Sequence, residues 1–123
     1  MTLRQNPNIA IVDDDEGVRA SLENYLRAAG VAVSTFGSAE TFLASPERLE
    51  TDCLVTDLHM PGMDGLALQA ELNRLGRAFP VIVMTAFPTD AAREESVRQG
   101  AAAFLAKPVD PDALLDRIGE ILQ

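Results

Sequence analysis

Charged and hydroxyl side chains that could act together in chemistry follow the apolar segments of this sequence. They are Asp13-Asp14-Asp15 after NIAIV, Asp57 after CLVT, Thr85 with Ala86 after PVIVM, and Lys107 after AAFLA. Lys107 is the only lysine of the chain. If the segments are parallel strands of one sheet, their carboxyl ends lie at one edge, where ligands of such sheets bind. We therefore expect carboxylates, a hydroxyl and an ammonium to meet there.

Such a group of side chains suits phosphoryl chemistry on a carboxylate. Crowded carboxylates raise one another's pKa unless a cation lies among them, and Mg²⁺ prefers one or two carboxylates plus waters. The cluster therefore predicts a Mg²⁺ site, to which the main-chain carbonyl of His59 can add an oxygen. A carboxylate there can attack phosphorus, while Mg²⁺ and the ammonium neutralise the transferring oxygens. Thr85 can donate a hydrogen bond to one of these oxygens, and the small Ala86 leaves room for the group.

Apolar runs alternate with amphipathic stretches five times along the chain. The predicted strands are Asn8–Asp13, Val31–Phe36, Cys53–Asp57, Pro80–Thr85 and Ala102–Ala106. The predicted helices are Glu16–Ala29, a short one capped by Ser38 and ending near Ala44, one capped by Asp64 with Leu68, Leu72 and Leu75 facing inward, Asp90–Gln99, and one capped by Asp110. Apolar strands separated by helices predict a parallel sheet covered on both faces. The fold class is α/β: a doubly wound, flavodoxin-like (βα)₅ sheet, for which the order 2-1-3-4-5 is common.

Composition limits the classes of function. The 123 residues fit one domain, so residues 1–123 are expected to form a single domain, and any output domain would lie beyond this chain. The net charge of -9 argues against direct nucleic-acid binding by this segment. No apolar run approaches the ~20 residues that span a membrane. The lone Cys53 cannot form an internal disulfide, which favours a cytoplasmic location.

Four motifs carry a resemblance to a known family. They are IVDDDEGVR (Ile11–Arg19), VTDLHMPGMDG (Val55–Gly65), VIVMTA (Val81–Ala86) and FLAKP (Phe104–Pro108). In this order and at these spacings, they resemble the receiver domain of two-component response regulators, the CheY-like group. The resemblance covers nearly the whole chain.

The resemblance implies a role for each residue of the cluster. Asp57 would accept a phosphoryl group from a sensor histidine kinase. Asp14, Asp57 and the His59 main-chain carbonyl would bind Mg²⁺, with Mn²⁺ as a substitute, and Asp13 would support the metal through water. Thr85 and Lys107 would hold the phosphoryl group beside Ala86, and Thr85 and Phe104 would form the switch. The domain would then be a phosphorylatable switch and not an enzyme with turnover.

The resemblance also suggests how the switch is read and how long it lasts. The predicted helix Asp90–Gln99 offers only alanines and Val97 for burial, so we expect it to be lightly anchored and able to move. The face formed by the fourth helix, the fifth strand and the fifth helix is the candidate for partner contact or homodimerisation, with transcription as one output. In receivers, the positions of His59 and Phe87 line the path of the hydrolytic water. Our hypothesis is that Phe87, followed by Pro88, hinders that water.

Other interpretations remain open at this point. A Mg²⁺-dependent aspartyl-phosphate phosphohydrolase is the alternative function, but such enzymes have a second Asp where this chain has His59. A receiver fold that no longer takes phosphate would have lost Asp14, Asp57 or Lys107. Each residue also has a local interpretation: a helix cap for the acids after the first strand, a strand-end threonine for Thr85, a surface lysine for Lys107, and simple packing for Phe104.

Overall fold

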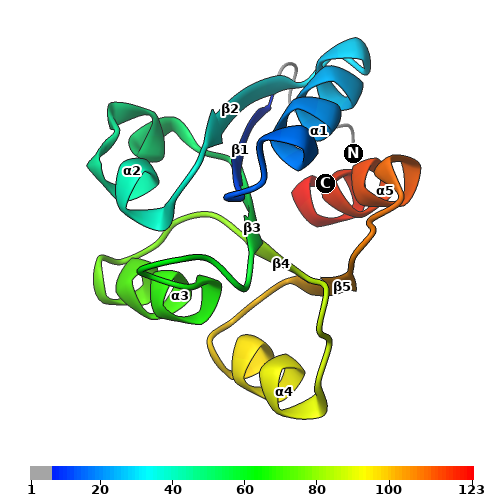
Figure 1. Cartoon of the computed structure of the whole chain (residues 1–123). Helices are drawn as coiled ribbons and strands as arrows, with labels where there is room; N and C mark the ends of the chain where they lie inside the picture. Colours follow the sequence, from blue (N-terminus) through cyan, green and yellow to red (C-terminus); the bar gives the residue numbers. More distant parts are fainter. Residues whose placement is uncertain (1–6) are drawn as a thin grey trace.

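The computed structural model describes residues 7–123, which form a five-stranded parallel sheet with the order β2-β1-β3-β4-β5 (Figure 1). The strands are β1 (Asn8–Val12), β2 (Ala32–Phe36), β3 (Cys53–Asp57), β4 (Val81–Thr85) and β5 (Ala103–Ala106). The predicted fold class and strand order are confirmed. The β-branched β2 lies at an edge of the sheet, and β1 and β3 are neighbours near its centre.

Helices cover both faces of the sheet (Figure 1). They are α1 (Glu16–Ala28), α2 (Ala39–Ala44), α3 (Gly65–Arg74), α4 (Asp90–Arg98) and α5 (Pro111–Leu122), with a 3-10 helix at Pro46–Glu50 after α2. Helices α1 and α5 pack on one face, and α2, α3 and α4 pack on the other. The two faces explain the strand sequences, because Ile9 and Ile11 enter one core while Ala10 and Val12 enter the other.

Cys53 opens β3 and has no solvent exposure. Burial, with a smaller contribution from the charge of Asp52, raises the pKa of its thiol to about 12. A thiol that stays protonated in an apolar layer is a weak nucleophile, so Cys53 acts as a small core residue.

Two predicted core positions are wrong. Leu75 follows the last residue of α3 and is 45% exposed, because the helix ends before its side chain can turn inward. Val97 is 59% exposed, and the buried residue of α4 is instead its neighbour Ser96. The hydrophobic sequence pattern misplaced the inner face of α4 because that face is polar.

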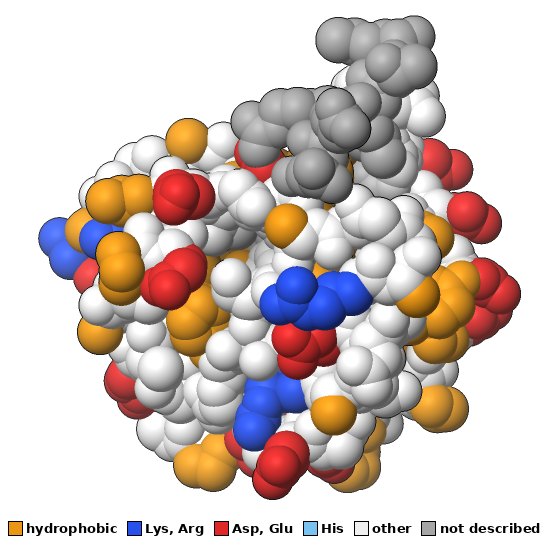
Figure 2. All heavy atoms as spheres, turned by 90° about the horizontal axis from the view of Figure 1, so that it is seen from above, with side chains coloured by type: hydrophobic (Ala, Val, Ile, Leu, Met, Phe, Trp, Pro, Cys, Tyr) orange, Lys and Arg blue, Asp and Glu red, His pale blue; other side chains and the backbone are white. Residues whose placement is uncertain are grey.

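The surface carries mixed charge. Seen from above in Figure 2, most Lys and Arg side chains lie beside Asp and Glu, and hydrophobic side chains form small separate groups. This face therefore presents no broad basic area among the residues described. None of the helices within residues 7–123 has the length and apolar character that a membrane span requires.

The end of the loop between β3 and α3 contacts the backbone at the start of the same loop. The N–H of Gly65 donates to the carbonyl of Leu58 at 2.8 Å, and Asp64 caps α3 by accepting from the N–H of Ala67 at 2.8 Å. A Cβ on Gly65 would lie 2.6 Å from the Asp57 carbonyl oxygen and 2.9 Å from the Leu58 Cα. Only glycine lets α3 begin this close to the end of β3.

We expect Gly65→Ala to destabilise the domain by about 2 kcal/mol, because the new methyl group would have to displace backbone atoms. The free energy of unfolding from urea titration would measure this. Gly37→Ala is the matched control, since its Cβ would lie 3.4 Å from the nearest atom, on the flexible side chain of Arg19. Equal stability of the two variants would contradict the close approach at Gly65.

Candidate functional site

Three carboxylates converge where β1 and β3 end. One oxygen each from Asp13, Asp14 and Asp57 lies within 4.8 Å of the others. Asp13 follows β1 directly, and Asp57 is the last residue of β3, the strand paired beside it. Asp13 has no solvent exposure and Asp57 only 5%, whereas Asp14 is exposed. The sheet therefore brings together the acids that the sequence predicted would meet.

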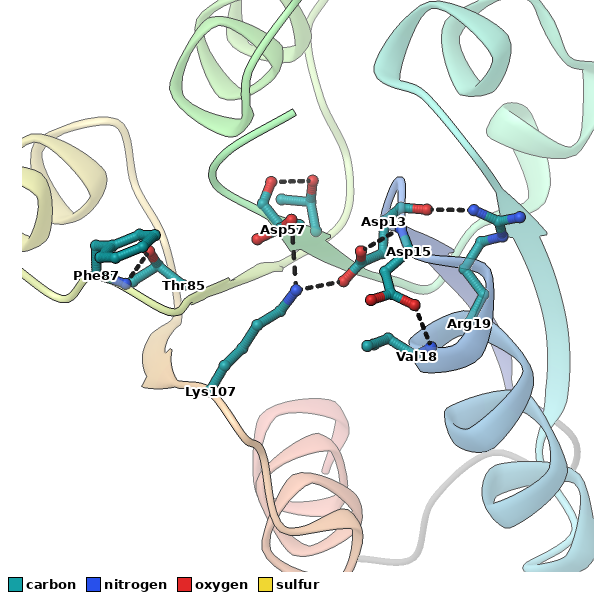
Figure 3. A network of polar contacts seen from close by, with 9 residues as sticks. Asp13, Asp15, Val18, Arg19, Asp57, Thr85, Phe87 and Lys107 are labelled. Carbon is teal, nitrogen blue, oxygen red and sulfur yellow. Dashed lines mark hydrogen bonds and ion pairs between the residues drawn. The ribbon is translucent and has the colours of Figure 1, made fainter. Parts of the chain in front are cut away.

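Lys107 reaches the same place from the end of β5. Its Nζ lies 2.7 Å from Asp13 Oδ2 and 3.4 Å from Asp57 Oδ2 (Figure 3). Its backbone N–H donates to the Thr85 carbonyl at 2.8 Å, which fixes the start of the side chain beside β4. The peptide bond to Pro108 is cis. One ammonium thus neutralises part of the charge of two buried carboxylates.

The loop after β1 holds Asp13 in place. Asp13 Oδ1 accepts from the N–H of Asp15 at 2.9 Å, and its carbonyl accepts from Arg19 Nη1 at 2.6 Å (Figure 3). Asp15 caps α1 by accepting from the N–H of Val18 at 3.1 Å, so the local interpretation holds for that residue. Sequence reasoning missed the contact of Arg19, because the spacing alone does not show that an arginine on the first turn of α1 can fold back onto the strand end.

The electrostatics of the site follow from burial and crowding. Burial, followed by the negative charge of Asp13, raises the pKa of the Asp57 carboxyl, and the nearby Lys107 ammonium offsets only part of this. For Lys107, burial acts to lower the pKa, but the hydrogen bond and charge of Asp13 outweigh it, so its pKa is raised and it stays protonated. The remaining negative charge and the all-oxygen donor set fit a hard divalent cation such as Mg²⁺.

Thr85 ends β4, which lies between β3, the strand that ends at Asp57, and β5, the strand that precedes Lys107, and Ala86 follows Thr85. Thr85 is buried, and its Oγ1 accepts from the N–H of Phe87 at 3.0 Å (Figure 3). Within residues 7–123 its hydroxyl makes no hydrogen bond to Asp57 or Lys107. Ala86 is exposed and lines, with Lys107, a cavity of about 540 Å³ between the first turns of α1 and the loop before α5. The strand order places the Thr85 hydroxyl at the same edge of the sheet as Asp57, but the two side chains do not form a hydrogen bond.

The remaining predicted residues surround this edge. His59 is exposed, and its ring lies 5.7 Å from the ring of Phe87 in an edge-on arrangement. Phe87 is 68% exposed. Phe104 on β5 is 9% exposed, and the guanidinium of Arg93 lies over its ring. Sequence reasoning missed Arg93, which looked like one more charge on an exposed helix.

Comparison with known proteins assigns the family. Residues 9–119 match the family described as "Response regulator receiver domain". The chain belongs to the response regulator receiver domain family. This family is the receiver domain of response regulators in two-component signalling, and it is not a classical enzyme family.

The curated relatives are longer than this receiver domain. It is 42% identical to the transcriptional regulatory protein FixJ of Azorhizobium caulinodans over 107 residues, which are 87% of this chain and 51% of that protein. It is also 42% identical to the DNA-binding transcriptional regulator NtrC of Klebsiella pneumoniae over 110 residues, which are 87% of this chain and 24% of that protein. The receiver domain therefore spans about half or less of these relatives.

Solved structures share the fold. The crystal structure of FixJ-N is 37% identical, with a TM-score of 0.84 over 94% of this chain and 92% of that chain. A CheY-like receiver domain protein from Methanospirillum hungatei is 30% identical, with a TM-score of 0.89 over 95% of this chain and 94% of that chain. A structure of the BeF3-activated DrrB receiver domain is 27% identical, with a TM-score of 0.86 over 95% of this chain and 97% of that chain.

We expect Asp57→Asn to raise the free energy of unfolding at neutral pH in metal-free buffer. The pKa of Asp57 is higher in the folded chain than its ordinary value of about 4, so the wild-type domain loses stability as pH rises through that raised pKa. Asparagine does not ionise. The advantage of the variant should therefore be largest at neutral pH and disappear below about pH 4, where Asp57 is protonated in both folded and unfolded chains.

Urea titrations with EDTA at a series of pH values would measure this difference. Asp116→Asn, which removes an exposed carboxylate on α5, is the control. An Asp57→Asn variant that is less stable than the wild type at neutral pH would show that the pair with Lys107 outweighs burial and repulsion.

Proposed function

We propose that this receiver domain accepts a phosphoryl group on Asp57 from a phosphohistidine of a sensor histidine kinase, in a reaction that requires Mg²⁺. The supporting observation is the buried Asp57 carboxylate between two further carboxylates and the Lys107 ammonium. In this position, the Lys107 ammonium can neutralise charge on the oxygens of a transferring phosphoryl group, and the neighbouring carboxylates can bind a metal ion.

In the proposed reaction, an oxygen of Asp57 attacks phosphorus, the phosphorus–nitrogen bond breaks, and the donor imidazole leaves with that electron pair. Bound Mg²⁺ would supply positive charge to the phosphoryl oxygens. Asp14, Asp57 and the main-chain carbonyl of His59 would hold the ion, with Mn²⁺ as a substitute, and Asp13 would support it through water. The acid anhydride formed on Asp57 is the signal.

Lys107 and Thr85 would then hold the new phosphoryl group beside Ala86. The Lys107 Nζ already lies within 3.4 Å of Asp57 Oδ2, so it can bind a phosphoryl oxygen with a small side-chain movement. The Thr85 hydroxyl would have to turn away from the N–H of Phe87, which it binds now. Losing that contact would free the loop that leads to α4, and so Thr85 with Phe104 would carry the change to the helix.

The output of the switch is proposed from the relatives. FixJ and NtrC are named as transcription regulators, and both extend well beyond the part that matches this receiver domain. We infer that the domain acts in the cytoplasm and that an output domain, such as a transcription regulator, lies outside residues 1–123. We also infer that the face formed by α4, β5 and α5 contacts this output domain, a partner protein or a second copy of the receiver domain.

Incubation with acetyl phosphate and Mg²⁺ should add one phosphoryl mass to the protein, as measured by intact mass spectrometry. Asp57→Asn or EDTA should abolish the shift, and Asp116→Asn should keep it. A shift that survives in Asp57→Asn would contradict the choice of acceptor. Sustained release of phosphate from varied monoesters would instead favour the phosphohydrolase.

We expect Phe87→Ala to shorten the lifetime of the phosphorylated form by about tenfold, a change of ~1.4 kcal/mol in the barrier to hydrolysis. The exposed ring stands against His59 at the rim of the site, where it would obstruct the attacking water. Decay of the phosphorylated mass over time is the measurement. Leu49→Ala removes a similarly exposed side chain from the 3-10 helix and should leave the lifetime unchanged. An unchanged rate in Phe87→Ala would refute the hindrance hypothesis.

A further inference from the structure

Helix α4 is attached to α3 mainly by polar contacts. Gln69 and Ser96 are almost fully buried: Gln69 Nε2 donates to the Ser96 carbonyl at 3.1 Å, and Ser96 Oγ donates to Gln69 Oε1 at 3.4 Å. Near the end of the helix, Asn73 Nδ2 donates to the Gln99 carbonyl at 2.8 Å. Within the described residues, the apolar contribution of α4 to the core is the partly buried Ala92. Directional hydrogen bonds, rather than apolar area, therefore place this helix.

Arg93 precedes Ser96 by three residues and so lies on the same side of α4, where it faces β5. Its Cζ is 4.9 Å from the centroid of the Phe104 ring. Within residues 7–123 it forms no ion pair, unlike Arg98 on the same helix, which pairs with Glu95. A guanidinium over the face of an aromatic ring is attracted by the ring electrons, and it also covers the ring from water.

We propose that Arg93 is a positioning residue that keeps the Phe104 ring buried and so couples the place of α4 to the conformation of β5. Outward rotation of Phe104 must break the contact with Arg93, and displacement of α4 must uncover the ring. The two movements are therefore linked in both directions. This inference rests on the proposed function in one respect: Phe104 is the switch aromatic of the proposed signalling mechanism, so its position matters for signalling only if that mechanism operates.

Packing alone is the competing explanation for the buried ring, because Phe104 also belongs to the core cluster that contains Val83 and Leu54. The two explanations differ in what the charge contributes. If packing suffices, removing the guanidinium leaves the ring in place. If Arg93 holds it, the ring becomes more exposed while the rest of the domain stays folded.

Fluorine NMR of the whole chain labelled with 4-fluorophenylalanine would test this. The chain has five phenylalanines, and the signal of Phe104 is assigned as the one missing from Phe104→Leu. In Arg93→Gln we expect this signal to move toward its position in the unfolded chain, with a larger shift between H₂O and D₂O. The expected change in the ratio of buried to exposed ring is about two- to fivefold, the size of an exposed cation–π contact. Amide hydrogen exchange in α4 should accelerate by a similar factor.

Two matched variants complete the experiment. Arg93→Lys keeps a cation and should retain most of the wild-type signal, and Arg98→Gln removes a different arginine from α4 and should leave the Phe104 signal unchanged. An unchanged signal in Arg93→Gln would overturn the proposal in favour of packing. Equal changes in Arg93→Gln and Arg98→Gln would also overturn it, because they would indicate general loosening of the helix.

The measurement needs no phosphoryl donor. If Asp57 were not phosphorylated, the dependence of the Phe104 signal on Arg93 would still stand. If the dependence were absent while Asp57 was phosphorylated, only the role of Arg93 would be lost.

Discussion

Repulsion between carboxylates is the interaction that the rest of this site must accommodate. The register of β1 on β3 pairs Val12 with Thr56, so the next residues, Asp13 and Asp57, lie side by side. Two charges less than 5 Å apart repel by on the order of 3 kcal/mol at an effective dielectric constant of about 20. The Lys107 ammonium lies closest to Asp13 and further from Asp57, so it compensates one acid better than the other. The site keeps an excess of negative charge at Asp57, as the proposed binding of a cation and the proposed attack of Asp57 on phosphorus would require.

The surrounding backbone cannot relax to relieve this repulsion. Strands β3 and β4 are buried over their whole length, and α3 begins in contact with the carbonyl of Asp57 because Gly65 has no side chain. A sheet packed on both faces resists displacement of its strands. A new charge at Asp57 would therefore act on what can move: the Lys107 side chain, the Thr85 hydroxyl and the loop that follows β4.

The sequence predicted the sheet and the meeting of the acids because both depend on simple rules. Apolar runs locate the strands, and the carboxyl ends of parallel strands share an edge, so the convergence of Asp14, Asp57 and Lys107 follows from topology. The failures have a common physical origin. Each failure depends on where a helix ends or how it is rotated against its neighbours. These two features decide the exposure of Leu75 and Val97, and they also decide what Arg19 and Arg93 contact. The 3-10 helix Pro46–Glu50 was likewise missed, because Pro46 indicates the end of α2 but not the conformation that follows.

The polar attachment of α4 has a consequence for how the helix can move. An apolar interface loses area gradually when one element slides, whereas a buried pair such as Gln69 and Ser96 is either matched or unmatched. A broken hydrogen bond in a buried place costs the desolvation of both partners, about 1–3 kcal/mol each, so intermediate positions of the helix are disfavoured. We expect an element held in this way to move between discrete positions. If Thr85 acts as proposed, a small rearrangement there would produce a defined change at α4, provided that it supplies enough free energy to exchange one set of contacts for another.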